Sequence, residues 1–173
     1  DYRRSDVEQL ITIPARDRLI VDTYLSHVNG RRGVVFCVNV RHSDGMAQLF
    51  RDHGIPAASV SGRMTPMERE TILSAFEAGE LKVLCACDVL TEGWDCPAVE
   101  VLMMARPTLS KVVYLQQIGR GTRRSPGKEC LVVIDFVDNT NKYNVSLSLH
   151  RVLGKQKYRP GGLVVAPQEG IEA

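Results

Sequence analysis

Short runs of apolar, β-branched residues alternate along the chain with longer stretches of helical spacing, and this alternation limits the fold most strongly. It is typical of a parallel β-sheet whose strands are connected by helices on its faces. The run GVVFCVNV at 33–40 is apolar nearly throughout, so it predicts a buried central strand. The sequence therefore predicts an α/β fold with a parallel sheet.

The predicted elements follow one another without an internal repeat or a long linker, which indicates a single domain over residues 1–173. Residues 155–173 are rich in glycine and proline and are predicted to form a flexible tail. The predicted strands cover 7–13, 33–40, 57–60, 82–87, 99–104 and 129–136, and the predicted helices cover 14–28, 66–78, 111–118 and 144–153, with a further helix after residue 43 or 44.

Two helix starts have clear capping residues. Thr65 is the predicted N-cap, Pro66 suits the first helical position, and Glu68 completes a capping box. One helix earlier, Ser43 or Asp44 is predicted to be the N-cap.

The composition excludes some classes of protein. The apolar fraction of 44% and the charged fraction of 24% are ordinary for a soluble globular chain, and no apolar run is long enough to span a membrane. The net charge of +2 does not by itself indicate a nucleic-acid-binding protein. Five cysteines without a CxxC pair predict free thiols and no metal site, as expected for a cytoplasmic protein. The start without Met is that of a fragment or a trimmed chain.

Two arginines three positions apart, Arg120 and Arg123, follow a predicted helix and have glycines beside and between them. Guanidinium groups at this spacing can point at one anionic target, and their planar forks fit phosphate oxygens. An alternative is a solvated basic helix end.

The surrounding sequence QQIGRGTRR, at 116–124, resembles motif VI of superfamily 2 helicases, and its wording is most similar to the motor subunits of type I and III restriction enzymes. This resemblance implies a three-layer RecA-like domain with a mostly parallel sheet. It also implies that Arg120 and Arg123 are catalytic arginine fingers for the γ-phosphate of ATP. Gln116 and Gly119 would then lie on the nucleotide side.

Residues 83–97, VLCACDVLTEGWDCP, resemble motif V of the same superfamily. The resemblance implies that Gly93 and Asp95 bind the nucleotide, with the carboxylate reaching the ribose, and that Thr91 approaches nucleic-acid phosphates. Cys87 departs from the threonine of many relatives, so a hydroxyl contact is missing there. Trp94 is interpreted as a core residue.

Residues 35–42 resemble motif IV, which makes Asn39, Arg41 and His42 candidates for contact with nucleic acid or nucleotide. His42 is equally suited to cap the following helix. All three lie at the carboxyl tip of a predicted strand, where open α/β sheets bind ligands.

Two further segments resemble parts of the same superfamily, and the first of them resembles a segment that contacts the nucleic-acid backbone. In the first, Ser61, Gly62 and Arg63 precede a helix N-terminus, an arrangement that suits a phosphate. In the second, Arg106 either meets nucleic acid or braces the helix that Ser110 is predicted to cap. Asp135 at the end of the last predicted strand is expected to have a structural role.

The chain contains neither a G-x-x-x-x-G-K-[ST] phosphate loop nor a D-E-x-H or D-E-x-D box. In the resembled superfamily both lie on a preceding RecA-like domain, which would be this chain's partner and would hold most of the ATP and Mg²⁺. The chain alone is therefore predicted not to hydrolyse ATP.

The leading hypothesis is the second motor half of an ATP-dependent helicase or translocase that acts on nucleic acid, with DNA favoured and no membrane partner. One alternative is an RNA helicase of the DEAD-box kind, although that group usually has His at the position of Gln116. Another is a non-catalytic nucleic-acid-binding module. A nucleotide-binding enzyme of the ordinary doubly wound type lacks support, because no G-x-G-x-x-G follows the first strand.

Overall fold

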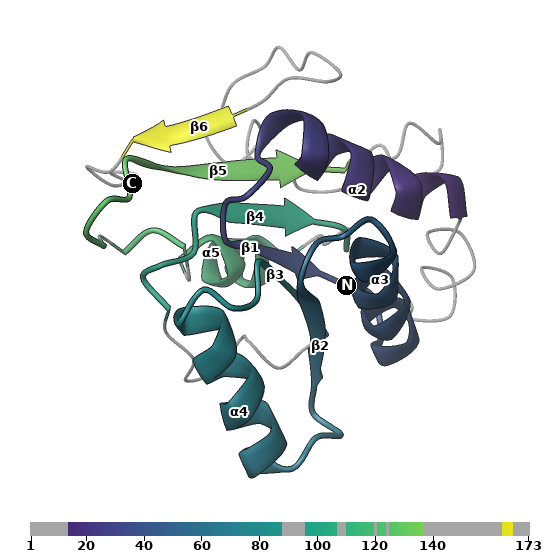
Figure 1. The fold of residues 1–173 in the computed structure, drawn as a ribbon. Coiled ribbons are helices and arrows are strands. Elements are labelled where there is room, and N and C mark those ends of the chain that lie inside the picture. Colours follow the sequence, from purple (N-terminus) through teal and green to yellow (C-terminus); the bar gives the residue numbers. More distant parts are fainter. Residues whose placement is uncertain are drawn as a thin grey trace.

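The structure, a computed structural model, describes residues 14–87, 96–106, 110–119, 121–123, 125–136 and 164–167. Their strands form one six-stranded sheet in the order β2-β3-β1-β4-β5-β6 (Figure 1). The first five strands in this order run parallel, and β6 is antiparallel to β5. The strands are β1 (Gly33–Phe36), β2 (Ala57–Ser61), β3 (Val83–Cys87), β4 (Val101–Met104), β5 (Cys130–Asp135) and β6 (Val164–Pro167).

Helices cover both faces of the sheet, and alternate strand residues supply the two cores. On one face, α2 (Pro14–His27) and α3 (Val40–Asp52) bury side chains such as Tyr24 and Phe50 against the sheet. On the other face, α4 (Pro66–Glu77) and α5 (Lys111–Gly119) bury Phe76, Tyr114 and Ile118. The predicted three-layer α/β architecture is thereby confirmed, and β1 is the buried, central strand that the sequence predicts.

The end of β1 differs from the prediction. The strand ends at Phe36, and α3 begins at Val40, so the predicted strand at 33–40 is too long. Asn39, and neither Ser43 nor Asp44, is the N-cap: its side chain accepts a hydrogen bond from the backbone N–H of His42 at 2.7 Å. Ser43 lies inside the helix, where its hydroxyl donates to the carbonyl of Cys85 at 2.6 Å.

The start of α4 confirms the predicted capping box. The Thr65 hydroxyl accepts from the Glu68 N–H at 3.3 Å, and the Glu68 carboxylate accepts from the Thr65 N–H at 2.8 Å. The Thr65 N–H and the Thr65 hydroxyl both donate to the Glu68 carboxylate at 2.8 Å, and they lower the pKa of this carboxyl because they favour its ionised form. Pro66 occupies the first turn.

The predicted flexible tail is wrong for residues 164–167, which form β6. This strand pairs with β5 in the register Cys130↔Pro167 to Val133↔Val164, and so covers backbone groups that β5 would otherwise leave unpaired. The predicted strand at 7–13 and helix at 144–153 lie outside the described residues. No helix in the described ranges has the length and apolar character needed to cross a membrane.

Candidate functional site

The candidates for nucleic-acid contact follow three parallel strands of the same sheet, so they lie along one edge of it. Parallel strands end at the same edge, and here β2, β1 and β4 all end in candidate residues. Loops at this carboxyl edge are where open α/β sheets bind ligands. The described candidates are Ser61, Gly62 and Arg63 at the end of β2, Asn39, Arg41 and His42 after β1, and Arg106 after β4.

Arginine side chains give this edge its charge. Arg41 and Arg63 are exposed, and Arg106 is half-buried. Gly62 is exposed beside Arg63, in a turn closed by a 3.2 Å hydrogen bond from the Met64 N–H to the Ser61 carbonyl. Three arginines after three strands can meet successive phosphates without reading bases, because guanidinium groups bind phosphate oxygens directly.

Of the predicted contact residues, His42 and Ser61 are buried, and the half-buried Asn39 has its side chain engaged by a backbone N–H. Only 2% of His42 is exposed: its Nδ1 accepts from the Val38 N–H at 3.3 Å, and its Nε2 lies 3.1 Å from an oxygen of Asp17. Its ring therefore ties α2 to the start of α3 and has no free face for a ligand. Ser61 is 3% exposed and shapes the turn before Arg63, and the Asn39 side chain is used as the helix cap.

The described candidates for the nucleotide side lie on α5 and in the loop that follows it. This helix starts after β4, where the Ser110 hydroxyl accepts from the Val113 N–H at 3.3 Å, as predicted for its cap. Its nine residues span about 13 Å toward the opposite edge of the sheet. Its Tyr114 hydroxyl donates to Asp135 at 2.6 Å, so Asp135 has the structural role expected of it.

The loop after α5 lies against the amino ends of β4 and β5. Gly121 is buried there, and a Cβ on it would lie 2.6 Å from Leu131 and 3.2 Å from Leu102. Arg123 follows on this loop and is exposed. Arg123 is therefore separated from the carboxyl-edge arginines by the length of α5.

One face of α5 is turned outward. Val112 is 64% exposed and Leu115 39% exposed, and Gln116 and Gly119 are exposed beside them. Their spacing of three and four residues puts them on the same side of the helix. The Gln116 carboxamide on this face and the Arg123 guanidinium on the following loop both carry N–H donors, which fit polyphosphate oxygens. The remaining predicted site residues, Thr91, Gly93, Asp95 and Arg120, lie outside the described residues.

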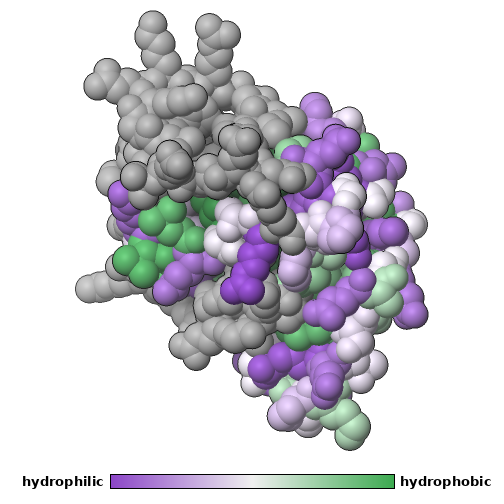
Figure 2. All heavy atoms as spheres, turned by 90° about the vertical axis from the view of Figure 1, so that its left-hand side faces the viewer, coloured by the Kyte–Doolittle hydropathy of each residue, from purple (hydrophilic) through white to green (hydrophobic). Residues whose placement is uncertain are grey.

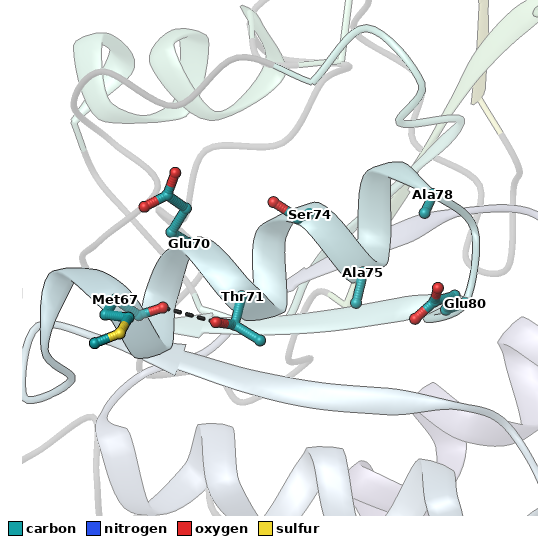
Figure 3. A pocket seen from close by; sticks show the side chains of 7 residues that line it. All are labelled: Met67, Glu70, Thr71, Ser74, Ala75, Ala78 and Glu80. Atoms are coloured by element: carbon teal, nitrogen blue, oxygen red, sulfur yellow. Dashed lines mark hydrogen bonds between the residues drawn. The ribbon is translucent and has the colours of Figure 1, made fainter.

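The hollow along the outer face of α4 does not suit a phosphate ligand. Glu70 and Glu80 contribute carboxylates to its lining, and the Thr71 hydroxyl already donates to the Met67 carbonyl at 2.9 Å (Figure 3). The other lining residues are small, and Met67 is 74% exposed. Carboxylates would repel nucleic acid, so the carboxyl edge remains the better candidate surface.

Sequence reasoning missed two buried cations. Arg16 in α2 is 8% exposed and donates to the carbonyls of Ala105 at 2.8 Å and Phe136 at 2.9 Å, just beyond β4 and β5. It therefore braces the carboxyl edge next to Arg106. Its spacing of four from Ile20 puts it on the inward face of the helix, a signal that could have found it. The second is Lys128, whose burial lowers its pKa.

Among the described residues, hydrophilic side chains predominate on the side seen in Figure 2, and apolar side chains lie between them in several places. Isolated apolar side chains are common on protein surfaces, whereas an apolar area with a polar rim is typical of a contact site.

Comparison with known proteins identifies the kind of domain. Residues 15–125 match the model of the helicase conserved C-terminal domain. Irc3 of Schizosaccharomyces pombe, provisionally named a mitochondrial ATP-dependent helicase, is 41% identical over 128 residues, which cover 73% of this chain and 20% of that protein. The ATP-dependent RNA helicase DBP3 of Ajellomyces capsulatus is 32% identical over 106 residues, which cover 61% of this chain and 21% of that protein. The chain thus spans about a fifth of the length of these relatives.

Solved structures agree on the architecture. Dbp5 of Saccharomyces cerevisiae, determined with RNA and ADP BeF3, superposes with a TM-score of 0.66 at 19% identity, over 83% of this chain and 37% of that chain. This likeness confirms the RecA-like fold predicted from the sequence.

Proposed function

Since the chain belongs to the family of helicase conserved C-terminal domains, within superfamily 2, we propose that it is the second motor domain of an ATP-dependent nucleic-acid helicase or translocase. It grips nucleic acid along the carboxyl edge of its sheet. It presents Arg120 and Arg123 to ATP that a preceding RecA-like domain holds together with Mg²⁺.

One observation carries this proposal: α5 connects two groups of candidate residues that lie at opposite edges of the sheet. Arg41, Arg63 and Arg106 are at the carboxyl edge, and Arg123 follows the far end of α5, a helix about 13 Å long. A domain that couples hydrolysis to movement needs separate sites for nucleotide and nucleic acid, with a rigid element between them. The hydrogen bond from Tyr114 to Asp135 ties this element to the sheet.

The part of Arg120 and Arg123 in the chemistry is electrostatic. Their fixed positive charges stabilise the negative charge that develops on the transferred γ-phosphoryl group, an effect worth about 10³–10⁵ in rate for arginine fingers. Gln116, Gly119, Gly93 and Asp95 complete the nucleotide side, and ATP supplies the phosphoanhydride bond that water cleaves.

The outward face of α5 supports a contact with the preceding domain. Val112 and Leu115 leave apolar surface exposed next to Gln116. Closure of the two domains around ATP would cover this surface and align the arginines. The chain alone, without that partner, is expected not to hydrolyse ATP.

The nucleic acid is proposed to be DNA, because the sequence of residues 116–124 resembles motif VI of restriction-enzyme motor subunits. RNA is the second candidate, favoured by the identity to an RNA helicase over 106 residues. Arginines that contact the nucleic-acid backbone bind the phosphates of DNA and of RNA, so the carboxyl edge itself does not distinguish the two.

The test joins this domain to its upstream domain and measures ATP hydrolysis with no nucleic acid, single-stranded DNA, duplex DNA or RNA. We expect stimulation, strongest with DNA, and loss of turnover in Arg123→Ala but not in Arg18→Ala, which changes an exposed arginine on α2. If only RNA stimulates ATP hydrolysis, RNA and not DNA is the nucleic acid on which the motor acts. Binding without turnover in the unmutated protein would make the chain a binding module.

A further inference from the structure

Lys128 is a buried lysine whose ammonium donates to three backbone carbonyls of the described residues. It is 7% exposed, and its Nζ donates to the carbonyls of Gly121, of Arg123 at 2.9 Å and of Pro97 at 3.1 Å. An ammonium has three protons, so these three acceptors use its full donor capacity. Lys128 thereby joins the loop that carries Arg123 to the segment that follows 83–95.

Two glycines allow this arrangement. Gly127 has a φ of 79° and closes a turn in which the Lys128 N–H donates to the Ser125 carbonyl at 3.1 Å. This turn directs the lysine side chain back beneath the loop. Gly121, which has no Cβ, lets the loop come close enough to Leu131 for its carbonyl to reach the ammonium.

Filling space in the core does not require a lysine at this position. Burial disfavours its charge and is the main reason for its lowered pKa, and Glu100 opposes this effect without forming an ion pair with it in the described part of the chain. An apolar side chain of similar size would avoid this desolvation cost. What only a cation supplies here is simultaneous attachment of three carbonyls from two separate segments.

We propose that Lys128 is a positioning residue that fixes the loop of Arg123 relative to the segment at Pro97, so that the arginine meets the phosphate in a reactive geometry. Lys128 has this role only if the function proposed above holds. The three protons of the ammonium are used by backbone carbonyls, so it leaves no donor for a nucleotide or a nucleic acid. It acts through the carbonyl of Arg123 itself and through that of Gly121, two residues earlier.

Without Lys128 the loop keeps its packing at Gly121 but loses its attachment to Pro97. Small misplacements of catalytic groups reduce rates on the order of a hundredfold. Lys128→Met should therefore lower kcat for nucleic-acid-stimulated ATP hydrolysis by roughly tenfold to a hundredfold. The KM for ATP should change little, because the preceding RecA-like domain holds most of the nucleotide. The Kd for nucleic acid should also change little, because the arginines of the carboxyl edge lie elsewhere.

The experiment uses the protein with both motor domains and compares Lys128→Met with Lys111→Met, which changes an exposed lysine on α5. Thermal unfolding checks that both variants are folded. If Lys128→Met does not fold, Lys128→Gln, which keeps an amide donor, takes its place in the same comparison. A kcat within twofold of the Lys111→Met control would overturn the proposal.

A double-mutant cycle with Arg123→Lys separates positioning from a general loss of structure. If Lys128 acts through the arginine, its replacement should have a much smaller effect when Arg123→Lys is already present. If the two substitutions lower kcat by independent factors that simply multiply, Lys128 does not act through Arg123. If Arg123→Lys alone leaves turnover unchanged, the arginine-finger function itself has failed. If Arg123→Lys lowers kcat but Lys128→Met does not, the arginine-finger function stands and only the positioning role of Lys128 is refuted.

Discussion

Replacing Gly121 by alanine tests whether the loop after α5 is held against the sheet. The added Cβ would lie 2.6 and 3.0 Å from the two methyl carbons of Leu131 and 3.2 Å from a methyl of Leu102. Contacts this short require a side chain to move, and both leucines are buried, with exposed fractions of 4% and 0%. Overpacking of this kind costs about 1–3 kcal/mol.

Gly45→Ala is the matched control. Gly45 lies inside α3, is exposed, and a Cβ on it would have no neighbour within 4 Å. Alanine there should stabilise the domain by roughly 0.5–1 kcal/mol, since glycine is a poor helix former. The same chemical change should thus have opposite signs at the two positions.

The assay is unfolding of the chain by urea and by heat. For a domain of this size each 1 kcal/mol shifts Tm by roughly 2–4 °C, so Gly121→Ala should lower Tm by about 2–12 °C. Gly45→Ala should raise it slightly. A Gly121→Ala variant as stable as the unmutated chain would refute the close packing of the loop, and with it the fixed position inferred for Arg123.

Three further results are expected. Arg16→Leu should destabilise the domain by about 2–4 kcal/mol in urea unfolding, since it leaves two carbonyls beyond β4 and β5 without their donor; a change below 1 kcal/mol would contradict this. Tyr114→Phe should cost about 1.5–3 kcal/mol, because the lost hydrogen bond ends on the Asp135 carboxylate, and equal urea midpoints would argue against it. The lowered pKa of Lys128 predicts that stability rises with pH: between that pKa and the ordinary 10.5 only the unfolded chain keeps the proton, so raising pH through this window favours folding. The unmutated chain should therefore gain stability relative to Lys128→Met as pH approaches 10.5, whereas parallel pH curves would show that the pKa is not lowered.

The elements that the sequence predicted well are those whose signals are local. The capping box at Thr65 depends on residues within one turn, and the strand pattern depends on apolar runs of a few residues. The end of β1 was placed too late because Val38 and Val40 continue the apolar run, although Asn39 between them caps the helix.

The features that the sequence did not reveal depend on distant partners. Arg16 bonds to carbonyls 89 and 120 residues away, and nothing next to it in the chain indicates them. No local pattern marks Lys128 as buried, because its burial arises only when the loop folds back over β4 and β5. The pairing of β6 with β5 is likewise tertiary, which is why a segment rich in glycine and proline was taken for a tail. His42 was a candidate contact by position alone, and its burial became visible only with α2 beside it.

The central claim is that α5 joins two separable sites, one for nucleic acid and one for ATP. Its most direct test measures the Kd for nucleic acid and the kcat for ATP hydrolysis in Arg63→Ala and Arg123→Ala of the protein with both motor domains. Arg63→Ala should weaken nucleic-acid binding while saturating nucleic acid still supports near-normal kcat, and Arg123→Ala should lose most of kcat with an unchanged Kd. Loss of both properties in both variants, or loss of binding alone in Arg123→Ala, would contradict the account.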